Sequence, residues 1–262
     1  MPRVSLNGRC YIKDEGLSKI SGIRHGFTTA KGGFSSGKIE GLNLGFRVGD
    51  DRESVIKNYK AVAKDLDMSF DNMVLSRQTH TDNIRIVTTD DQGKGLTRES
   101  DIFDTDGLIT NVKNTPLVIF TADCIPVLLA DKDGRAVGAV HAGWRGTVMK
   151  IPKKAAELMA ITYDISPKDI VAAIGPGIGQ CCFEVGEEVA KEFDGSFVEK
   201  GSNGKFFVDL WEANFAALCE AGILPENISV SGVCTKCNCG EFYSYRAMGD
   251  KTGRLGALIE IK

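Results

Sequence analysis

Short apolar runs separated by turn residues recur along most of this chain. The clearest pair covers residues 125–129 and 136–140, which are joined by the turn sequence Asp-Lys-Asp-Gly at 131–134. Apolar runs of this length between turn residues are typical of buried strands. The pattern therefore predicts an antiparallel hairpin, in which the start of the first strand lies beside the end of the second. Cys124 and His141 occupy those two places, so we expect them to meet at one end of a sheet.

Helical periodicity is strongest over residues 51–66, where an apolar stripe follows a capping aspartate at Asp50 or Asp51. A second long helix is predicted at 146–163. Pro152 lies inside it, and proline is tolerated in a helix only near the first turn. The remaining predicted helices are shorter and cover 187–193 and 209–221.

The strand pattern favours sheets joined by hairpins. Residues 73–80 and 83–87 are expected to pair with each other as one such hairpin. Strands and helices do not alternate regularly, and no repeat or linker divides the chain. The sequence therefore predicts an α+β fold in a single domain, 1–262, with mixed, largely antiparallel sheets. The other predicted strands are 106–110, 116–124, 169–174, 228–234, 242–246 and 255–261.

Composition narrows the choice of partners. The chain is 42% hydrophobic and 26% charged, with a net charge of −3, which gives no reason to expect nucleic acid or an acidic membrane surface as a partner. The first residues contain no apolar signal segment, and no apolar run approaches the ~18 residues of a membrane helix. We therefore expect a cytoplasmic protein whose eight cysteines stay reduced.

Two of the three histidines stand at predicted strand ends near a cysteine. His80 follows one strand, Cys124 precedes another and His141 follows a third. If these ends converge, a Cys-His-His set with an open fourth position is the pattern of a catalytic zinc site. The same residues also fit a metal-free site in which Cys124 is a nucleophile and a histidine is its base. The third possibility is a purely structural role, with Cys124 as a core thiol and the histidines as hydrogen-bonded residues. The spacing of the residues does not distinguish these three hypotheses.

Several polar residues near this set are candidates for substrate binding. Asp123 precedes Cys124 and either orients a ligating histidine, accepts a ribose hydroxyl or caps a turn. Arg145 lies at the start of a predicted helix, between glycines. This stretch is either an anion-binding site at the helix N-terminus or a tight turn from strand to helix. Arg47 and Arg246 lie in turn-rich stretches and are further phosphate candidates, although a lone arginine is more often a solvated surface charge.

The remaining cysteines give a weaker metal signal. Cys234, Cys237 and Cys239 have the spacing C-x-x-C-x-C, which resembles part of a cluster-binding loop. Four ligands would require Cys10, Cys181, Cys182 or Cys219 to approach this loop. Because Cys181 and Cys182 are adjacent, their side chains are expected to point in different directions and to pack in the core rather than share a metal.

Long motifs in this chain resemble one known family. Arg-Gln-Thr-His at 77–80, Thr-Ala-Asp-Cys at 121–124, His-Ala-Gly-Trp-Arg-Gly at 141–146 and Phe-Tyr-Ser-Tyr-Arg at 242–246 resemble the YfiH-type laccase-domain proteins, which were long called polyphenol oxidases. The resemblance runs from about Gly26 to the C-terminus. It implies one α/β domain with sheets layered between helices. Cys237 and Cys239 lie outside the family pattern.

The resemblance also implies a chemistry. The zinc ligands of the family correspond to His80, Cys124 and His141 in this chain, and copper is another possible metal. Its activity is phosphorolysis of adenosine, inosine and methylthioadenosine, with deamination of adenosine, so the implied partners are a purine nucleoside and phosphate. Arg47, Arg145 and Arg246 become the phosphate candidates, and Asn43 and Asp123 become candidates for contacts to the sugar or base.

Three other functions compete with this interpretation. A hydrolase with Cys124 as nucleophile predicts activity without metal. A non-enzymatic metal- or nucleoside-binding protein predicts binding without turnover. The earlier copper-dependent phenol oxidase assignment conflicts with the composition, because three histidines cannot supply the imidazoles of a multicopper cluster.

Overall fold

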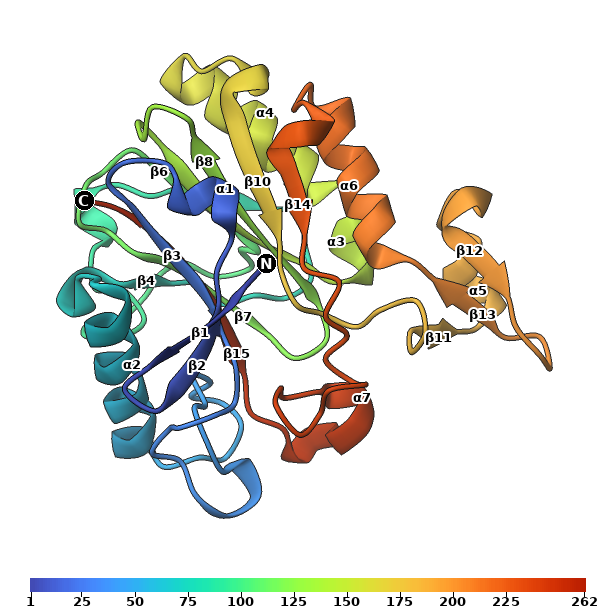
Figure 1. Ribbon diagram of the computed structural model, residues 1–262, viewed down its shortest axis with the longest axis horizontal. Coiled ribbons are helices and arrows are strands. Elements are labelled where there is room, and N and C mark those ends of the chain that lie inside the picture. The colour runs from blue at the N-terminus through green and yellow to red at the C-terminus, as the bar shows by residue number, and fades with distance from the viewer.

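Two six-stranded sheets packed face to face form the centre of the structure, a computed structural model that describes residues 1–262 (Figure 1). The helices are α1 (Glu15–Ser18), α2 (Arg52–Leu66), α3 (Trp144–Val148), α4 (Ile151–Tyr163), α5 (Glu187–Ala190), α6 (Leu210–Glu220) and α7 (Tyr245–Met248). The strands are β1 (Arg3–Leu6), β2 (Arg9–Ile12), β3 (Ile23–Thr28), β4 (Val74–Leu75), β5 (Ile84–Ile86), β6 (Gly107–Thr110), β7 (Leu117–Thr121), β8 (Ile125–Asp131), β9 (Val137–Ala142), β10 (Ile170–Ile174), β11 (Glu184–Val185), β12 (Val198–Lys200), β13 (Phe206–Val208), β14 (Ile228–Val230) and β15 (Leu255–Ile261).

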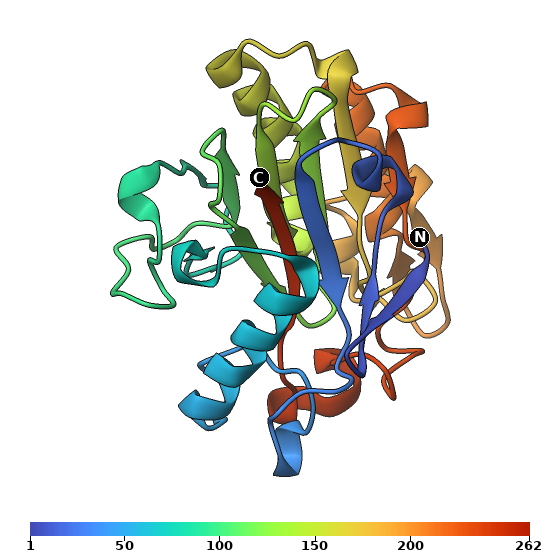
Figure 2. The ribbon, with the colours of Figure 1, turned by 60° about the vertical axis from the view of Figure 1, so that its left-hand side comes forward.

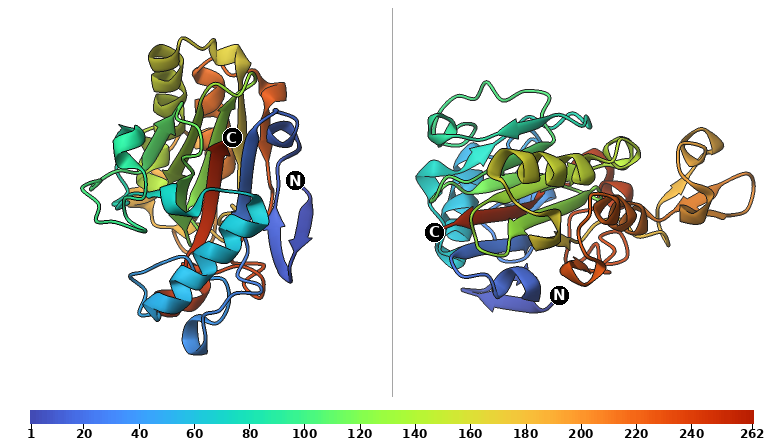
Figure 3. Two further views of the ribbon diagram at one scale, coloured as in Figure 1. Left: turned by 90° about the vertical axis from the view of Figure 1, so that its left-hand side faces the viewer. Right: turned by 90° about the horizontal axis from the view of Figure 1, so that it is seen from above.

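The strand order confirms the predicted α+β fold with mixed, largely antiparallel sheets. One sheet runs β1-β2-β3-β15-β7-β4 and the other β14-β10-β8-β9-β6-β5. Only the pairs β4–β7, β10–β14 and β5–β6 are parallel. A small antiparallel sheet, β11-β13-β12, projects from one end of the molecule together with α5 (Figures 1 and 3).

Apolar residues on both faces of the central strands create three core layers. Along β8, Val127 and Leu129 face the helices, whereas Leu128 and Ala130 face the other sheet. This is the period of two that a pleated strand imposes, and it explains why these runs are apolar throughout. α3, α4 and α6 cover the outer face of one sheet, and α2 covers the outer face of the other (Figure 2).

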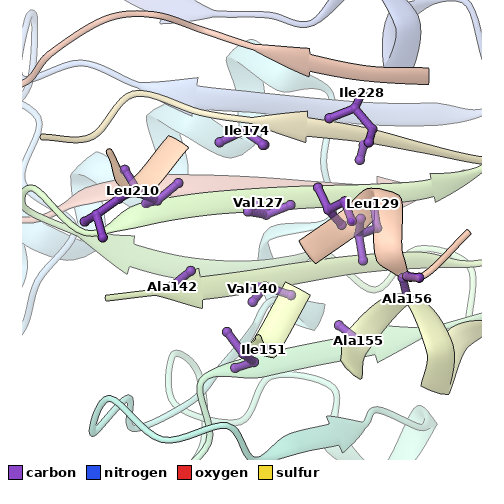
Figure 4. Packing of buried hydrophobic residues seen from close by; sticks show 14 of the residues in the cluster. Val127, Leu129, Val140, Ala142, Ile151, Ala155, Ala156, Ile174, Leu210 and Ile228 are labelled. Atoms are coloured by element: carbon purple, nitrogen blue, oxygen red, sulfur yellow. The ribbon is translucent and has the colours of Figure 1, made fainter. Parts of the chain in front are cut away.

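The layer beneath the helices holds the hairpin that carries the site. Val127 and Leu129 of β8, with Val140 of β9, pack against Ile151 and Ala155 of α4 (Figure 4). These side chains are fully buried. Burying a large aliphatic side chain stabilises the fold by about 1.5–3 kcal/mol relative to leaving it exposed. The hairpin is therefore a rigid base for the residues at its open end.

The predicted hairpin is confirmed, and so is the helix over 51–66. β8 and β9 pair antiparallel, with Ile125 opposite Ala142. α2 begins after Asp51, whose carboxylate accepts a hydrogen bond from Ser54 N–H, as expected for an N-cap.

Three predictions of secondary structure were wrong. β4 and β5 do not form a hairpin, because each pairs in parallel within a different sheet. The helix predicted at 146–163 is two helices. Lys150 adopts φ 56° between α3 and α4, so Pro152 falls in the first turn of α4, where it breaks no hydrogen bond. Residues 242–246 are not a strand, because the chain has already left the sheet at Val230 and Ser244 caps the start of α7.

None of the helices is both long enough and apolar enough to cross a membrane.

We expect His25 to make stability depend on pH in a defined window. Burial in β3, with the nearby Lys13 charge adding to the effect, lowers the pKa of His25 to about 4. Its Nε2 accepts a hydrogen bond from the backbone N–H of Asp14 at 2.9 Å, which requires the neutral ring. Below its ordinary pKa of 6.5 the unfolded chain binds a proton that the folded chain does not. Stability is therefore complete above pH 6.5 and falls by about 3 kcal/mol as the pH drops to 4.

Urea unfolding of the wild type and His25→Gln at several pH values tests this expectation. Glutamine retains an acceptor for Asp14 N–H but does not titrate. Across this window the free energy of unfolding should depend less steeply on pH in the variant. The difference in slope should correspond to the uptake of about one proton on unfolding. Parallel curves for the two proteins would contradict the assignment.

Candidate metal centre and its pocket

The hairpin places Cys124 beside His141, as the sequence predicted. Pro126 pairs with His141 in the β8–β9 register, and Cys124 directly precedes β8. His141 is buried, whereas Cys124 is half-buried. The open end of the hairpin therefore presents one thiol and one imidazole toward the same space.

His80 reaches this space from a loop rather than from a strand end. β4 ends at Leu75, and His80 lies beyond it with a backbone φ of 66°. Its Nε2 is 3.8 Å from the Cys124 sulfur, and its ring centroid is 5.0 Å from that of His141. The three potential ligand atoms all lie within 4.8 Å of one another. The structure thus brings the predicted triad together.

Asp106, at the start of β6, orients both histidines. Its buried carboxylate accepts a 2.7 Å hydrogen bond from His141 Nδ1, which leaves His141 Nε2 free to bind a metal. The same carboxylate accepts hydrogen bonds of 3.0 Å from the backbone N–H groups of Thr79, His80 and Thr81. One side chain therefore fixes the ring of His141 and the loop of His80.

These contacts shift three pKa values in a consistent way. Burial alone would raise the pKa of Cys124, but His141 and His80 lower it to about 6. Burial alone would lower the pKa of His141, but the Cys124 thiolate and Asp106 raise it to about 9. Despite burial, hydrogen bonds from His141 and from backbone N–H groups hold the pKa of Asp106 at about 2. At neutral pH the metal-free triad therefore contains a thiolate and an imidazolium.

Two residues of this centre have left-handed backbone. His80 has φ 66° and Asp123 has φ 85°, a region that costs about 1–3 kcal/mol for residues other than glycine. The hydrogen bonds to Asp106 hold the strained His80 loop in place. Strain of this kind persists where the surrounding structure fixes it, and it is often found at functional sites.

Gly143 leaves the space that a bound metal and its ligands require. A Cβ atom at this position would lie 2.7 Å from His80 Cδ2 and 3.1 Å from Cys124 Sγ. One thiolate and two imidazoles are the ligand types of catalytic zinc, and the missing fourth ligand leaves a position for water or substrate. The residues present thus fit one zinc ion, although imidazole and thiolate also bind copper.

The triad lines a pocket of about 970 Å³ whose wall is strongly cationic. Its acidic residues are Glu99 and Asp123, and the carboxylate of Asp123 is occupied within the protein. Such an excess of positive charge favours an anionic ligand. The pocket also holds six aromatic side chains, which suit a flat ring. The arginines are Arg47, Arg52, Arg77, Arg98, Arg145, Arg246 and Arg254, and the aromatic residues are Phe46, Phe103, Phe120, Trp144, Phe183 and Tyr245.

The substrate-binding residues proposed from the sequence have different positions. Arg47, Arg145 and Arg246 line the pocket. Asp123 lies on the wall, but its oxygens accept hydrogen bonds from Thr235 Oγ1 and Arg246 N–H, both at 2.6 Å. The structure does not place Asn43 on the pocket wall.

Asn43 is instead fully buried behind the pocket. Its Oδ1 accepts hydrogen bonds from the backbone N–H groups of Gly45 and Arg254, which both line the pocket. Its Nδ2 donates to Asp50 at 2.7 Å. Asn43 therefore supports two wall segments from behind rather than facing a ligand.

Sequence reasoning missed Asp106, Gly143 and four of the arginines. Asp106 had a usable signal, because it is a polar residue directly before an apolar run, like Cys124. Gly143 was treated only as part of a helix start. Among the arginines, Arg77 stands in the motif Arg-Gln-Thr-His but was not proposed as a site residue. Arg52, Arg98 and Arg254 lie in separate segments that reach the pocket only in the folded chain.

The prediction that Cys181 and Cys182 point apart into the core was wrong. Both sulfurs approach Cys237, at 3.6 and 3.4 Å, and the exposed Cys181 is not a core residue. The tight turn from Gly179 to Cys182 allows both side chains to face the same loop. With Cys234 they form a second group of potential metal ligands, whereas Cys239, Cys10 and Cys219 are not members.

Known proteins resemble this chain along nearly its full length. A family model described as multi-copper polyphenol oxidoreductase laccase matches residues 24–262. Purine nucleoside phosphorylase YlmD of Bacillus subtilis is 35% identical over 244 residues, covering 90% of this chain and 88% of that protein. Adenosine deaminase RL5 of an unknown prokaryotic organism is 35% identical over 239 residues, covering 87% and 90%. The crystal structure of the hypothetical protein YfiH of Bacillus licheniformis has a TM-score of 0.91 at 33% identity, covering 100% and 99%.

Gly143→Ala should weaken metal binding by displacing His80. Gly143 has φ −69° and ψ 174°, a conformation that alanine adopts freely, so the added methyl group acts through its contacts. We expect about a 10–100-fold loss of zinc affinity, comparable to losing a residue that orients a ligand. The measurement is zinc content after dialysis against increasing chelator, in which the variant should lose one zinc equivalent at concentrations that leave the wild type loaded.

Gly195→Ala is the matched control, because a Cβ there meets nothing within 4 Å. Equal zinc retention in Gly143→Ala and the wild type would show that Gly143 does not set the space of the triad.

Proposed function

The chain belongs to the family described as multi-copper polyphenol oxidoreductase laccase, and we propose that it is a purine nucleoside phosphorylase with a zinc ion held by His80, Cys124 and His141. The resemblance drawn from its motifs is confirmed by the family match. The observation that carries the proposal is the position of this triad in a cationic, aromatic-lined pocket. The relatives named as phosphorylases support the choice of reaction.

Phosphate binding is supported by arginines without partners inside the protein. Arg47, Arg52, Arg77 and Arg145 line the pocket, and none of their guanidinium groups donates a hydrogen bond or forms an ion pair within the chain. Arg145 is held in place by stacking over the Trp144 ring at 4.2 Å. Guanidinium groups match the oxygens of phosphate in charge and geometry, so these donors are available to an oxyanion.

Arg246 and Arg254 have a different role in this proposal. Arg246 Nη1 donates to the carbonyl oxygens of Cys182 and Glu184, and Arg254 Nη1 donates to those of Thr252 and Gly253. Their charge contributes to the field in the pocket while part of their donor capacity fixes the wall.

Nucleoside binding is supported by the aromatic wall. Purine bases stack on aromatic faces, and each stacked base is typically worth about 1–3 kcal/mol. Phe103 and Tyr245 are more than half exposed, at 55% and 51%, which leaves apolar surface for a ligand to cover. We propose adenosine, inosine and methylthioadenosine as substrates.

The reaction breaks the bond between ribose C1′ and a purine nitrogen. A phosphate oxygen forms the new bond to C1′, and the base leaves with the bonding electron pair and takes up a proton. Arginines hold the attacking phosphate, which removes the entropic cost of bringing two substrates together. Zinc bound to the triad supplies a Lewis acid and a water of lowered pKa. Asp106 keeps His141 Nδ1 protonated, so Nε2 stays directed at the metal position.

Adenosine deamination is a second proposed activity of the same pocket. In that reaction water adds to C6 of adenine and ammonia leaves. The relative named adenosine deaminase supports it, as does a three-ligand site that leaves a coordination position for water. All eight cysteines are free, which suits our proposal of a cytoplasmic location.

A thiol hydrolase is the alternative that a specific observation favours. Cys124, with its pKa lowered to about 6 beside His141, resembles the activated thiolate of such enzymes. It predicts activity that survives removal of metal. A multicopper phenol oxidase is not supported, because His25 lies buried in β3 and only two histidines reach the pocket.

The first test is incubation of the purified protein with inosine and phosphate. We expect hypoxanthine and ribose 1-phosphate, and we expect Cys124→Ala to reduce the rate by at least about 100-fold, because a Lewis acid contributes several kcal/mol. Cys219→Ala, a half-buried cysteine outside both cysteine-containing ligand groups, is the control and should retain activity. Absence of ribose 1-phosphate with the wild type would refute the phosphorylase. Undiminished turnover after complete removal of metal would favour the thiol hydrolase.

A second test separates phosphate binding from nucleoside binding. Arg145→Met keeps an unbranched apolar stem but removes the charge and the donors of the guanidinium group. We expect the KM for phosphate to rise about tenfold, the cost of one charge-assisted hydrogen bond, while the KM for inosine changes much less. Arg24→Met, outside the pocket, is the control. An equal rise in both KM values would argue against a specific phosphate contact.

A further inference from the structure

Four cysteines outside the triad converge at the surface beside the small sheet. Cys181 and Cys182 lie between β10 and β11, and Cys234 and Cys237 follow β14. Their four sulfur atoms all lie within 4.8 Å of one another. The two segments are more than fifty positions apart in the sequence, so tertiary structure alone assembles this group.

The sulfur spacing matches a tetrahedral metal site. A zinc–sulfur bond of 2.3 Å implies sulfur–sulfur distances of about 3.8 Å around one ion. Cys237 lies 3.6 Å from Cys181 and 3.4 Å from Cys182. A polynuclear iron–sulfur cluster places several atoms between its cysteines and requires wider spacing. The geometry therefore fits a single ion.

A disulfide does not account for the arrangement. Cys181 and Cys182 both approach Cys237, yet a disulfide would join only one of them to it and would leave the other beside the bond. All four cysteines are free. The convergence of four sulfurs on one point is the pattern of thiolate ligands.

Backbone hydrogen bonds hold both segments in position without a metal. Gly177 and Cys234 form a parallel β-bridge, and Thr235 N–H donates to Gly177 O at 2.9 Å. Cys182 N–H donates to Gly179 O at 2.9 Å, and Asn238 Nδ2 donates to Cys234 O at 2.8 Å. The ligands are thus preorganised, which lowers the cost of binding an ion.

The surroundings of Cys234 also favour a thiolate. The backbone N–H groups of Cys237 and Gly179 donate hydrogen bonds to the Cys234 sulfur. Hydrogen bonds of this kind to the sulfur stabilise its charged form. Cys234 and Cys237 also have the C-x-x-C spacing common in zinc sites.

We propose that Cys181, Cys182, Cys234 and Cys237 bind a second zinc ion through four thiolates. With four protein ligands the site has no open position, so its role is structural rather than catalytic. This proposal does not depend on the reaction proposed for the triad.

The site joins two parts of the pocket wall. Phe183 follows Cys182 directly, and the Arg246 guanidinium lies 5.5 Å from the centre of the Phe183 ring. Arg246 Nη1 also donates to Cys182 O at 3.2 Å. An ion held by both segments would therefore clamp the chain leading into the small sheet against the segment that carries Arg246.

Metal analysis of the full-length protein, reconstituted with zinc alone and freed of excess, tests the proposal. We expect about two zinc ions per chain in the wild type, about one in Cys237→Ser and about one in His80→Ala. The double variant should hold almost none. Cys239→Ser is the matched control, since Cys239 is exposed in the same loop but is not one of the four ligands, and it should hold about two.

Cobalt substitution identifies the ligands independently of activity. In the His80→Ala background, cobalt should give the intense near-ultraviolet sulfur-to-metal bands and visible bands of a tetrahedral thiolate site. These bands should vanish when Cys237→Ser is added, while circular dichroism shows an unchanged fold. Because Cys237 is exposed, its replacement leaves the core intact.

Two results would overturn the proposal. One is a zinc content in Cys237→Ser equal to that of the wild type, whether the wild type holds one ion or two. The other is fewer than eight titratable thiols in the metal-free, unreduced protein. Neither of them bears on whether the protein phosphorolyses nucleosides, so the two proposals fail separately.

Discussion

The carboxylate of Asp106 is the interaction on which the centre depends. It accepts the His141 Nδ1 proton and the backbone N–H groups around His80, so one buried charge places two of the three potential ligands. Removing it would leave the His80 backbone, at φ 66°, without the contacts that hold it. A carboxylate with no exposed surface stays ionised here because it accepts five hydrogen bonds, from His141, from three backbone N–H groups and from the Thr81 hydroxyl.

The sheets hold the potential metal ligands Cys124 and His141, and the irregular segments complete the pocket wall. β8 and β9 are buried on both faces, so the residues at their open end, Cys124 and His141, have little freedom to move. The segments that complete the pocket, including 95–103 and 245–246, lie in loops and in the short helix α7. The centre is therefore rigid, whereas much of the pocket wall comes from segments without long helices or strands.

The four-cysteine group lies where the chain leads into the small sheet, and a metal bound there would fix that segment to the main body. β11-β13-β12 projects from the main body and has little core of its own, yet the chain that leads into it carries Phe183 of the pocket (Figure 3). A small element with limited apolar burial gains stability from a cross-link between distant segments. Gly179, Cys182 and Cys234 already form the backbone contacts that such a link would use.

The sequence alone determined the elements whose signals are local. The β8–β9 hairpin, with Cys124 beside His141, followed from two apolar runs and a turn, and α2 followed from its stripe and its Asp51 cap, because residues nearby in sequence create both patterns. The motifs determined the family. Only the tertiary structure decided that β4 and β5 enter different sheets, that Asp106 lies beneath both histidines and that Cys181 and Cys182 share one neighbour. Pairing partners and side-chain directions depend on contacts between distant segments, and no local pattern encodes those contacts.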